Sequence, residues 1–305
     1  PGGSPPTGGH PGLGRGRHAR PLYRHPPGLR SRRIVPKKIR DPNGNAAVSP
    51  GAVNPAPIWV TVDADASPEQ IASFLLEAEP YGVILFARHL RDSRQVQELN
   101  ACIHGAISGW VPRIALDQEG GRVNRLSALG MSFPSASDLE GDAARAESVA
   151  YEMGGHLKTL GFDVDFAPVA DLGPAHPGTG LEGRVYGDDP ATVTACCGAF
   201  LRGLARAGIE GCLKHFPGLG GSRVDSHQGL PAMRGTPEER RPHLAPYASL
   251  KDRAPYVMVA HGAYEGLLGS LTPSSLEPET YRLLGTAGFS GLSVTDDLSM
   301  GAVGH

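Results

Sequence analysis

Four side chains suited to proton transfer or ligand binding lie close together in the segment 214–227, which reads KHFPGLGGSRVDSH. They are Lys214, His215, Asp225 and His227, and the residues between them are mostly small or Gly and Pro. Asp225 and His227 are two residues apart, so in an extended segment both side chains point the same way. A carboxylate beside an imidazole orients the ring and fixes its tautomer, as proton-transfer catalysis requires. The alternative is a polar surface loop with a solvated histidine, and these residues alone leave both open.

A second acidic pair, Asp296 and Asp297, follows an apolar run in the segment SVTDDLSM, residues 293–300. Two acids at such a place are costly to bury unless they are paired or functional. Side chains alternate along a strand, so one acid points inward and the other away. We expect Asp296 to be the functional one and Asp297 to be the N-cap of a following helix.

The segment DQEGGR, residues 117–122, follows another apolar run. Asp117 could accept hydrogen bonds from two hydroxyls of a polyol, and Arg122, with Arg125 just beyond the segment, could hold a carboxylate or a hydroxyl. Gly120 and Gly121 would let the backbone approach a ligand closely. A salt-bridged turn is the simpler interpretation when this segment is taken by itself.

The loop 182–189, with the sequence EGRVYGDD, supplies Arg184 as a further candidate contact to a ligand. Acidic residues surround it and precede Pro190, which is typical of a first helical position. We therefore expect the acids of this loop to cap a helix that begins at Pro190.

A metal-dependent hydrolase is a different chemistry that the same residues allow, because the set includes imidazoles and carboxylates suited to metals. Two observations oppose it. No His-x-His ends the first apolar run, and two of the candidate ligands stand on a glycine-rich loop that cannot hold metal geometry unaided. The set comprises His215, Asp225, His227, His261 and Asp296.

Composition limits the class of protein. The 305 residues suffice for one large α/β domain or two smaller ones. Residues 1–40 hold ten Lys/Arg and no acid, so the other 265 residues carry a net charge of −12. An acidic body argues against a nucleic-acid partner. We expect the segment 1–55, rich in Pro, Gly and Arg, to be disordered, because it has too little apolar surface to bury.

The cysteines have no zinc-binding spacing and predict free thiols in a reducing compartment. No apolar run approaches the length of a membrane span, and no segment resembles a signal peptide. We therefore expect a cytoplasmic protein without membrane association. Because the first methionine is Met131, we also expect the sequence to be a gene fragment or to have an uncertain start. The four cysteines are Cys102, Cys196, Cys197 and Cys212.

From residue 56 onward, short apolar runs alternate with longer amphipathic ones, which predicts a parallel sheet with crossover helices. Predicted strands are 58–62, 82–86, 113–117, 163–168, 211–215, 256–261 and 292–296. Predicted helices are 68–78, 93–107, 143–160, 190–207, 237–250 and 277–284.

Polar residues end so many of these strands that a (β/α)₈ TIM barrel is favoured over a doubly wound sheet, which collects them at its switch point. Seven strands are visible, and the sequence stops soon after the seventh. We therefore expect residues 56–305 to be an α/β barrel domain that lacks its last strand and helix.

Taken together, these motifs resemble the single-domain bacterial β-N-acetylglucosaminidases (β-N-acetylhexosaminidases) of glycoside hydrolase family 3. The resemblance runs from about residue 58 to the end, and KHFPG…DSH together with TDDLSM is its most specific part. The other matching pieces are ILFARHLRD (84–92), ALDQEGGRVNRL (115–126), DFAPVADL (165–172), GRVYGDDP (183–190), VMVAH (257–261) and VTDDLSM (294–300).

The resemblance implies a retaining exo-β-N-acetylglucosaminidase without a metal or organic cofactor, whose usual role is to trim muropeptide fragments in the cytoplasm. Asp296 matches the nucleophile, His227 the general acid/base and Asp225 its dyad partner, on a loop that closes over the substrate. The full-length protein would be a monomer with a small carbohydrate as its partner. The positions that match the family's sugar-binding residues are Asp117, Arg125, Arg184, Lys214 and His215.

Three departures from the family pattern stand out: Leu219 replaces the histidine of the usual PGHG, the eighth strand is missing, and the basic N-terminal segment has no counterpart. Leu219 affects neither member of the proposed dyad. Alternatives of the same fold are a β-glucosidase or a glycoside phosphorylase, because a histidine acid/base admits an anionic phosphate acceptor. An inactive sugar-binding remnant is the alternative without catalysis.

Overall fold

The computed structural model describes residue 2 and residues 55–303. Apart from residues 2 and 55, the segment 1–55 lies outside the described residues, and so does the prediction of its disorder. The described chain from residue 55 onward belongs to one compact unit.

Seven parallel strands form one sheet in the order β1-β2-β3-β6-β7-β8-β9. Each strand pairs with the next one along the chain, and helices cross over between them, which is the connectivity of a (β/α) barrel. The strands are β1 (Ala56–Val60), β2 (Pro80–Leu85), β3 (Arg113–Leu116), β6 (Val164–Asp165), β7 (Glu210–Phe216), β8 (Tyr256–Val259) and β9 (Leu292–Thr295).

The indole of Trp59 shows that this sheet is curled. It projects from β1, yet its ring centroid lies 5.1 Å from that of Phe166, directly after β6, and 6.1 Å from that of Tyr256 on β8. In a flat sheet, strands about 4.8 Å apart would separate β1 from β8 by more than 20 Å, roughly five strand spacings. These rings therefore meet inside the barrel.

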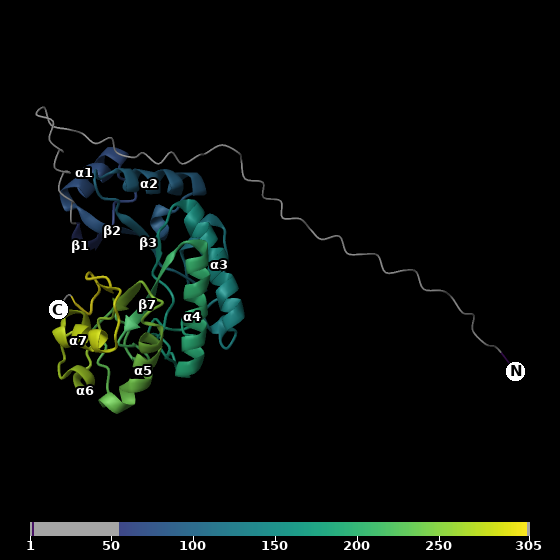
Figure 1. The fold of residues 1–305 in the computed structure, drawn as a ribbon, viewed down its shortest axis with the longest axis vertical. Coiled ribbons are helices and arrows are strands. Elements are labelled where there is room, and N and C mark those ends of the chain that lie inside the picture. Colours follow the sequence, from purple (N-terminus) through teal and green to yellow (C-terminus); the bar gives the residue numbers. More distant parts are fainter. Residues whose placement is uncertain (1, 3–54, 304–305) are drawn as a thin grey trace, which may run out of the picture. The chain divides into compact units, whose positions relative to one another are not determined.

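Helices wrap around the outer side of the sheet (Figure 1). Ser67 and Thr236 begin two of them with reciprocal capping boxes, and proline stands at the start of four, as expected. Among the described residues, no helix combines the length and apolar character needed to cross a membrane. The helices are α1 (Pro68–Ala78), α2 (Ser93–Gly105), α3 (Ala143–Leu160), α4 (Pro190–Ala207), α5 (Pro237–Leu250), α6 (Glu265–Leu268) and α7 (Pro278–Thr286), with 3₁₀ turns η1 (Ala87–His89), η2 (Arg125–Leu129), η3 (Ser137–Leu139) and η4 (Ser274–Leu276).

A small hairpin of β4 (Gln118–Gly120) and β5 (Val123–Asn124) follows β3 and was not predicted. It corrects the interpretation of Gly120 and Gly121 as places for a ligand. Both have positive φ, and a Cβ on Gly120 would lie 2.2 Å from the carbonyl oxygen of Pro134. The two glycines are there because the protein's own backbone approaches them.

The predicted α/β barrel without its last strand is confirmed, with all seven strands and six longer helices near their predicted places. The strand predicted at 163–168 is much shorter, because Pro168 has no N–H for the ladder. Beyond it, the N–H of Phe166 donates to Leu116, the N–H of Cys212 donates to Ala167, and a bridge joins Val169 and Lys214. The first strand begins and ends two residues earlier than predicted, and Val62 is buried in the loop beyond it.

Within residues 55–303, β1 and β9 each pair on one side only. Ile58 on β1 is 45% exposed and Leu292 on β9 is 49% exposed. Unpaired, apolar edges favour association with other strands. We therefore expect the 305-residue chain, expressed alone, to melt at low temperature or to oligomerise. Light scattering after size exclusion, together with calorimetry, tests this, and a monomer with one cooperative, high-temperature transition would contradict it.

Candidate active site

Polar side chains gather where the parallel strands end, as they do at the catalytic face of a barrel. Asp117 directly follows β3, and Asp171 follows β6 after a short extended segment. Lys214 and His215 occupy the last part of β7, and Asp296 directly follows β9. Asp117, Lys214, His215 and Asp296 were singled out in the sequence.

A network of four charges joins the ends of β3 and β7 to the loop that carries Arg184. Nζ of Lys214 lies 2.7 Å from Oδ1 of Asp117 and 2.6 Å from Oε1 of Glu119. Arg184 donates from Nε and Nη2 to the two carboxylate oxygens of Glu119, at 2.7 and 2.8 Å. Lys214 and Glu119 are buried and Arg184 nearly so. The network therefore holds two cations and two anions in fixed positions.

The environment of Glu119 decides its ionisation. Burial disfavours its charge, but the attraction and hydrogen bonds of Arg184 and Lys214 outweigh burial and hold its pKa far below the usual value. Asp165 differs: burial raises its pKa well above the ordinary range, because only the backbone N–H of Gln118 bonds to it directly. Glu119 is thus held as a carboxylate, whereas burial favours the protonated form of Asp165.

Replacing Glu119 by Gln is expected to destabilise the fold by about 3–5 kcal/mol at pH 7, because it leaves Lys214 and Arg184 without a shared buried anion. The pKa of Glu119 is lowered on folding from 4.5, so its stabilising effect is complete above that pH. Below pH 4.5, the difference in free energy of unfolding between wild type and variant should narrow as Glu119 becomes protonated. Urea unfolding of both proteins across this pH range measures that difference.

Glu98→Gln is the matched control, because Glu98 forms an exposed pair with Arg94 at 2.8 Å on α2. It should leave the free energy of unfolding nearly unchanged. Equal effects of the two substitutions would contradict the buried network as a source of stability.

His215 pairs with Asp171. Nδ1 of His215 lies 2.7 Å from Oδ2 of Asp171, and both side chains are buried. Burial disfavours the Asp171 carboxylate, but the attraction and hydrogen bond of His215 and the N–H of Leu219 together hold its pKa below the ordinary value. Because the carboxylate accepts at Nδ1, the opposite nitrogen of the ring is left for a ligand.

The predicted dyad of Asp225 and His227 is present, but in a different backbone conformation. Nδ1 of His227 lies 2.8 Å from Oδ1 of Asp225, and the backbone N–H of His227 donates to the same oxygen at 3.0 Å. The segment is not extended: these residues form a turn in which the aspartate side chain accepts from the backbone two residues further on. The His227 side chain is 66% exposed and can reach a ligand.

Two neighbouring segments meet the dyad loop. A Cβ on Gly180 would lie 3.3 Å from both carboxylate oxygens of Asp225, so the loop before Arg184 packs against the dyad. The N–H of Gly301 donates to the carbonyl of His227 at 3.3 Å. Since Gly301 stands five residues after Asp296, this contact ties the dyad to the segment with the proposed nucleophile.

Asp296 lies at a fixed strand end. Its backbone N–H donates to Val259 at 2.9 Å, which extends the ladder between β9 and β8. Nε2 of the buried His261 lies 3.0 Å from the carbonyl oxygen of Asp297, which can only accept. Oδ1 of Asp297 accepts from the N–H and hydroxyl of Ser299, so Asp297 closes a turn while Asp296 remains half-buried at the rim.

Arg125 stands apart from the buried network. It is half-buried at the start of η2, and no partner for its buried Nε is found among the described residues. Sequence reasoning missed Glu119, although its position two residues after Asp117 placed both on one side of an extended segment. It also assigned Arg184 and Lys214 to the ligand alone, whereas both are already held by acids.

The metal-site alternative can be tested on the donor set. Within residues 55–303, no group of three or more His, Cys, Asp and Glu side chains is arranged to hold a metal ion. The three histidines considered as ligands bind different partners: His215 binds Asp171, His227 binds Asp225, and His261 binds Ser275. The residues therefore do not fit the metal site that this alternative requires.

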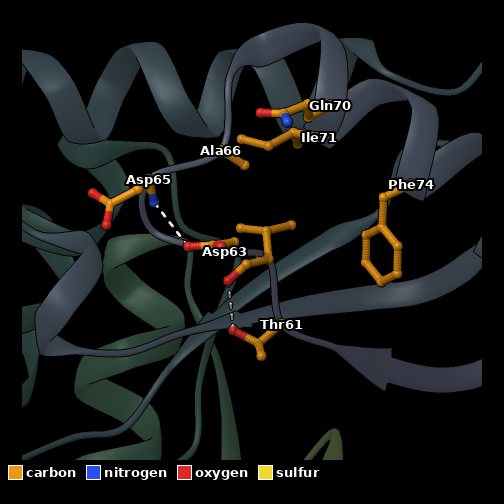
Figure 2. Close-up of a pocket in the computed structure, with 8 residues that line it drawn as sticks. Thr61, Asp63, Asp65, Ala66, Gln70, Ile71 and Phe74 are labelled. Atoms are coloured by element: carbon orange, nitrogen blue, oxygen red, sulfur yellow. Dashed lines mark hydrogen bonds between the residues drawn. The ribbon is translucent and has the colours of Figure 1, made fainter.

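Two cavities lie elsewhere in the structure. One, of about 410 Å³, is bounded by the loop after β1 and by α1, where Asp63 accepts from the backbone of Asp65 and Phe74 faces the opening (Figure 2). The other, of about 660 Å³, lies between residues 232–239 and 263–271. None of the predicted site residues lines either cavity.

Known proteins are similar to this chain in sequence and in fold. A family model described as the glycosyl hydrolase family 3 N-terminal domain matches residues 58–305. Beta-hexosaminidase LpqI of Mycobacterium tuberculosis is 40% identical over 196 residues, which cover 61% of this chain and 50% of that protein. A beta-hexosaminidase of Pseudomonas aeruginosa is 35% identical over 231 residues, covering 74% of this chain and 68% of that protein. The chain thus spans half to two thirds of these relatives.

Solved structures of glycoside hydrolases have a similar fold. A glycosyl hydrolase family 3 member from Mycobacterium smegmatis superposes with a TM-score of 0.71 at 34% identity, over 80% of this chain and 76% of that one. NagZ from Neisseria gonorrhoeae, in complex with N-trifluoroacetyl-D-glucosamine, gives 0.72 at 27% identity, over 80% and 75% of the two chains. With the barrel, its polar strand ends and these matches in agreement, the chain belongs to glycosyl hydrolase family 3, whose N-terminal domain it contains.

Proposed function

We propose that this chain contains the catalytic domain of a retaining exo-β-N-acetylglucosaminidase. The observation that carries the proposal is the Asp225–His227 dyad, whose loop is hydrogen-bonded to the segment directly after Asp296. A carboxylate nucleophile and an exposed, oriented imidazole on neighbouring segments supply the two groups that double displacement requires.

In the first step, a carboxylate oxygen of Asp296 attacks the anomeric carbon. Oδ1 of Asp296 accepts from the N–H of Asp297 at 2.9 Å, so Oδ2 is the freer oxygen for attack. The bond to the leaving oxygen breaks, and His227 donates a proton to that oxygen from Nε2. Asp225 holds the ring by Nδ1 and stabilises the imidazolium that acts as the acid.

In the second step, neutral His227 takes a proton from a water molecule, and the water oxygen attacks the anomeric carbon of the glycosyl ester. The ester bond breaks, and Asp296 returns to its carboxylate form. One group thus serves as acid and then as base. Because a neutral imidazole does not repel anions, phosphate could replace water as acceptor, and this would make the enzyme a phosphorylase.

The buried network supports recognition of a terminal sugar. Lys214 and Arg184 hold the carboxylates of Asp117 and Glu119 at the rim, where Asp117 could accept hydrogen bonds from sugar hydroxyls. His215 offers its second ring nitrogen beside them. The beta-hexosaminidase names of the relatives support an N-acetylated sugar, and the family resemblance supports muropeptide fragments as the natural substrates.

Comparing aryl β-N-acetylglucosaminide with aryl β-glucoside tests the proposal, with nitrophenol release as the readout. Preferential cleavage of the first sugar, unaffected by chelator, supports it. Equal or greater cleavage of the glucoside would make the chain a β-glucosidase, and sugar 1-phosphate formed in phosphate buffer would make it a phosphorylase. Binding of N-acetylglucosamine by a folded chain without any turnover would identify an inactive remnant.

A further inference from the structure

The segment 217–221 connects β7 to the loop that carries the dyad, and Leu219, which packs in a buried apolar cluster, is its only side chain other than glycine and proline. It reads PGLGG, with φ of 115° at Gly218 and 80° at Gly221. A Cβ on Gly220 would lie 2.1 Å from the carbonyl oxygen of Leu172. Such a segment is free to take many conformations in isolation. Contacts from other parts of the protein must therefore hold this segment in its observed conformation.

Arg240 on α5 provides the most extensive hold. Its guanidinium donates from Nη1 to the carbonyl of Gly220 at 3.1 Å and from Nη2 to the carbonyl of Gly218. The hydroxyl of Tyr264 donates to the same Gly218 carbonyl at 2.9 Å, and Arg240 stacks 5.5 Å above the Tyr264 ring. On the other side, Oδ1 of Asp171 accepts from the N–H of Leu219 at 2.7 Å.

Arg240 has an unusual environment for an arginine. It is only 5% exposed, and among residues 55–303 no acid forms an ion pair with it. Its Nε has no partner there, and burial lowers the pKa of the guanidinium below its ordinary value. A buried cation whose polar partners are two loop carbonyls is costly to the fold. The fork geometry of arginine, which lysine lacks, suits two carbonyls two residues apart.

We propose that Arg240 is a positioning residue that sets the direction in which the glycine-rich segment delivers His227 to the leaving oxygen. It does not touch substrate, and acts through the carbonyls of Gly218 and Gly220. The inference rests on the proposed function, since it assigns Arg240 to the step in which His227 donates its proton. Loss of Arg240 should then impair acid catalysis more than sugar binding.

Arg240→Met tests this with two substrates compared by kcat/KM, which reports the first step. For an N-acetylglucosamine disaccharide, whose leaving group needs a proton, we expect a loss of about 30-fold or more. For a dinitrophenyl N-acetylglucosaminide, which leaves without protonation, we expect a loss under about 3-fold. Arg240→Lys should give an intermediate loss. Arg241→Met, an exposed neighbour on the same helix, should behave as wild type.

Equal losses on both substrates in a folded variant, or no loss on either, would overturn the proposal. If Arg240→Met does not fold, Arg240→Lys and Tyr264→Phe answer the question, since the latter removes only one bond to Gly218.

Hydrogen exchange tests the anchoring without any substrate. Exchange in the peptide 217–229 should quicken at least about tenfold in Arg240→Lys, with the rest of α5 unchanged. An unchanged exchange rate of this peptide in Arg240→Lys would contradict the proposed anchoring, even if the enzyme proves inactive. Failure of wild type to cleave either N-acetylglucosaminide would instead refute the proposed function.

Discussion

Asp296→Asn is expected to abolish turnover of an aryl β-N-acetylglucosaminide, with kcat falling at least about 10⁴-fold, because an amide cannot replace the carboxylate nucleophile. The fold should persist, since the amide oxygen can still accept from the N–H of Asp297. The measurement is nitrophenol release by variant and wild type at equal folded concentration, with thermal melting as the check on folding.

Asp297→Asn is the matched control, one residue further along. Its carboxylate closes a turn onto Ser299, and an amide oxygen can still accept there. We expect it to retain activity within about tenfold of wild type. Appreciable activity in folded Asp296→Asn, or equal losses in both variants, would remove Asp296 from the nucleophile role.

His227→Ala should lower kcat/KM far more for an N-acetylglucosamine disaccharide than for an activated aryl glycoside. We expect losses of about 10²–10⁴-fold for the first and under tenfold for the second, because only the disaccharide needs a proton on its leaving oxygen. The ring is exposed and makes its side-chain hydrogen bond to Asp225, so removing it should cost the fold little. The measurement is kcat/KM for both substrates.

Azide provides the control for the second step. In His227→Ala it should raise kcat for the aryl glycoside and form glycosyl azide, because an anion attacks the intermediate without a base. His156→Ala, on the outer helix α3, is the control. It should keep the activity of wild type on both substrates, and azide should not raise its kcat. Equal losses on the two substrates, or no effect of azide, would argue against His227 as acid and base.

Much of the barrel could be predicted because its signals are local. Apolar runs, helix caps such as Ser67 and prolines at helix starts are readable within a few residues, and the order of the strands follows from their alternation with helices. The acids and bases at strand ends were found in the same way, since position along the chain fixes which end of a parallel strand they occupy.

The rest depended on partners far away in sequence. Glu119 meets Arg184, 65 residues later, so its role as the shared anion of two cations is visible only after folding. Gly120 resembled a ligand contact because the approach of Pro134 cannot be read from the chain. The hold of Arg240 on Gly218 was missed likewise, since an arginine in a helix rich in charge is typical of a solvent-exposed face.

The most direct test of the account is to trap the glycosyl–enzyme. A slowly hydrolysed, fluorinated N-acetylglucosaminyl fluoride would be incubated with wild type and with Asp296→Asn, followed by intact mass and peptide mapping. The account predicts one sugar added per chain, on the peptide containing Asp296, and no addition to the variant. Turnover of the reagent without any adduct, or an adduct on another residue, would contradict covalent catalysis by Asp296.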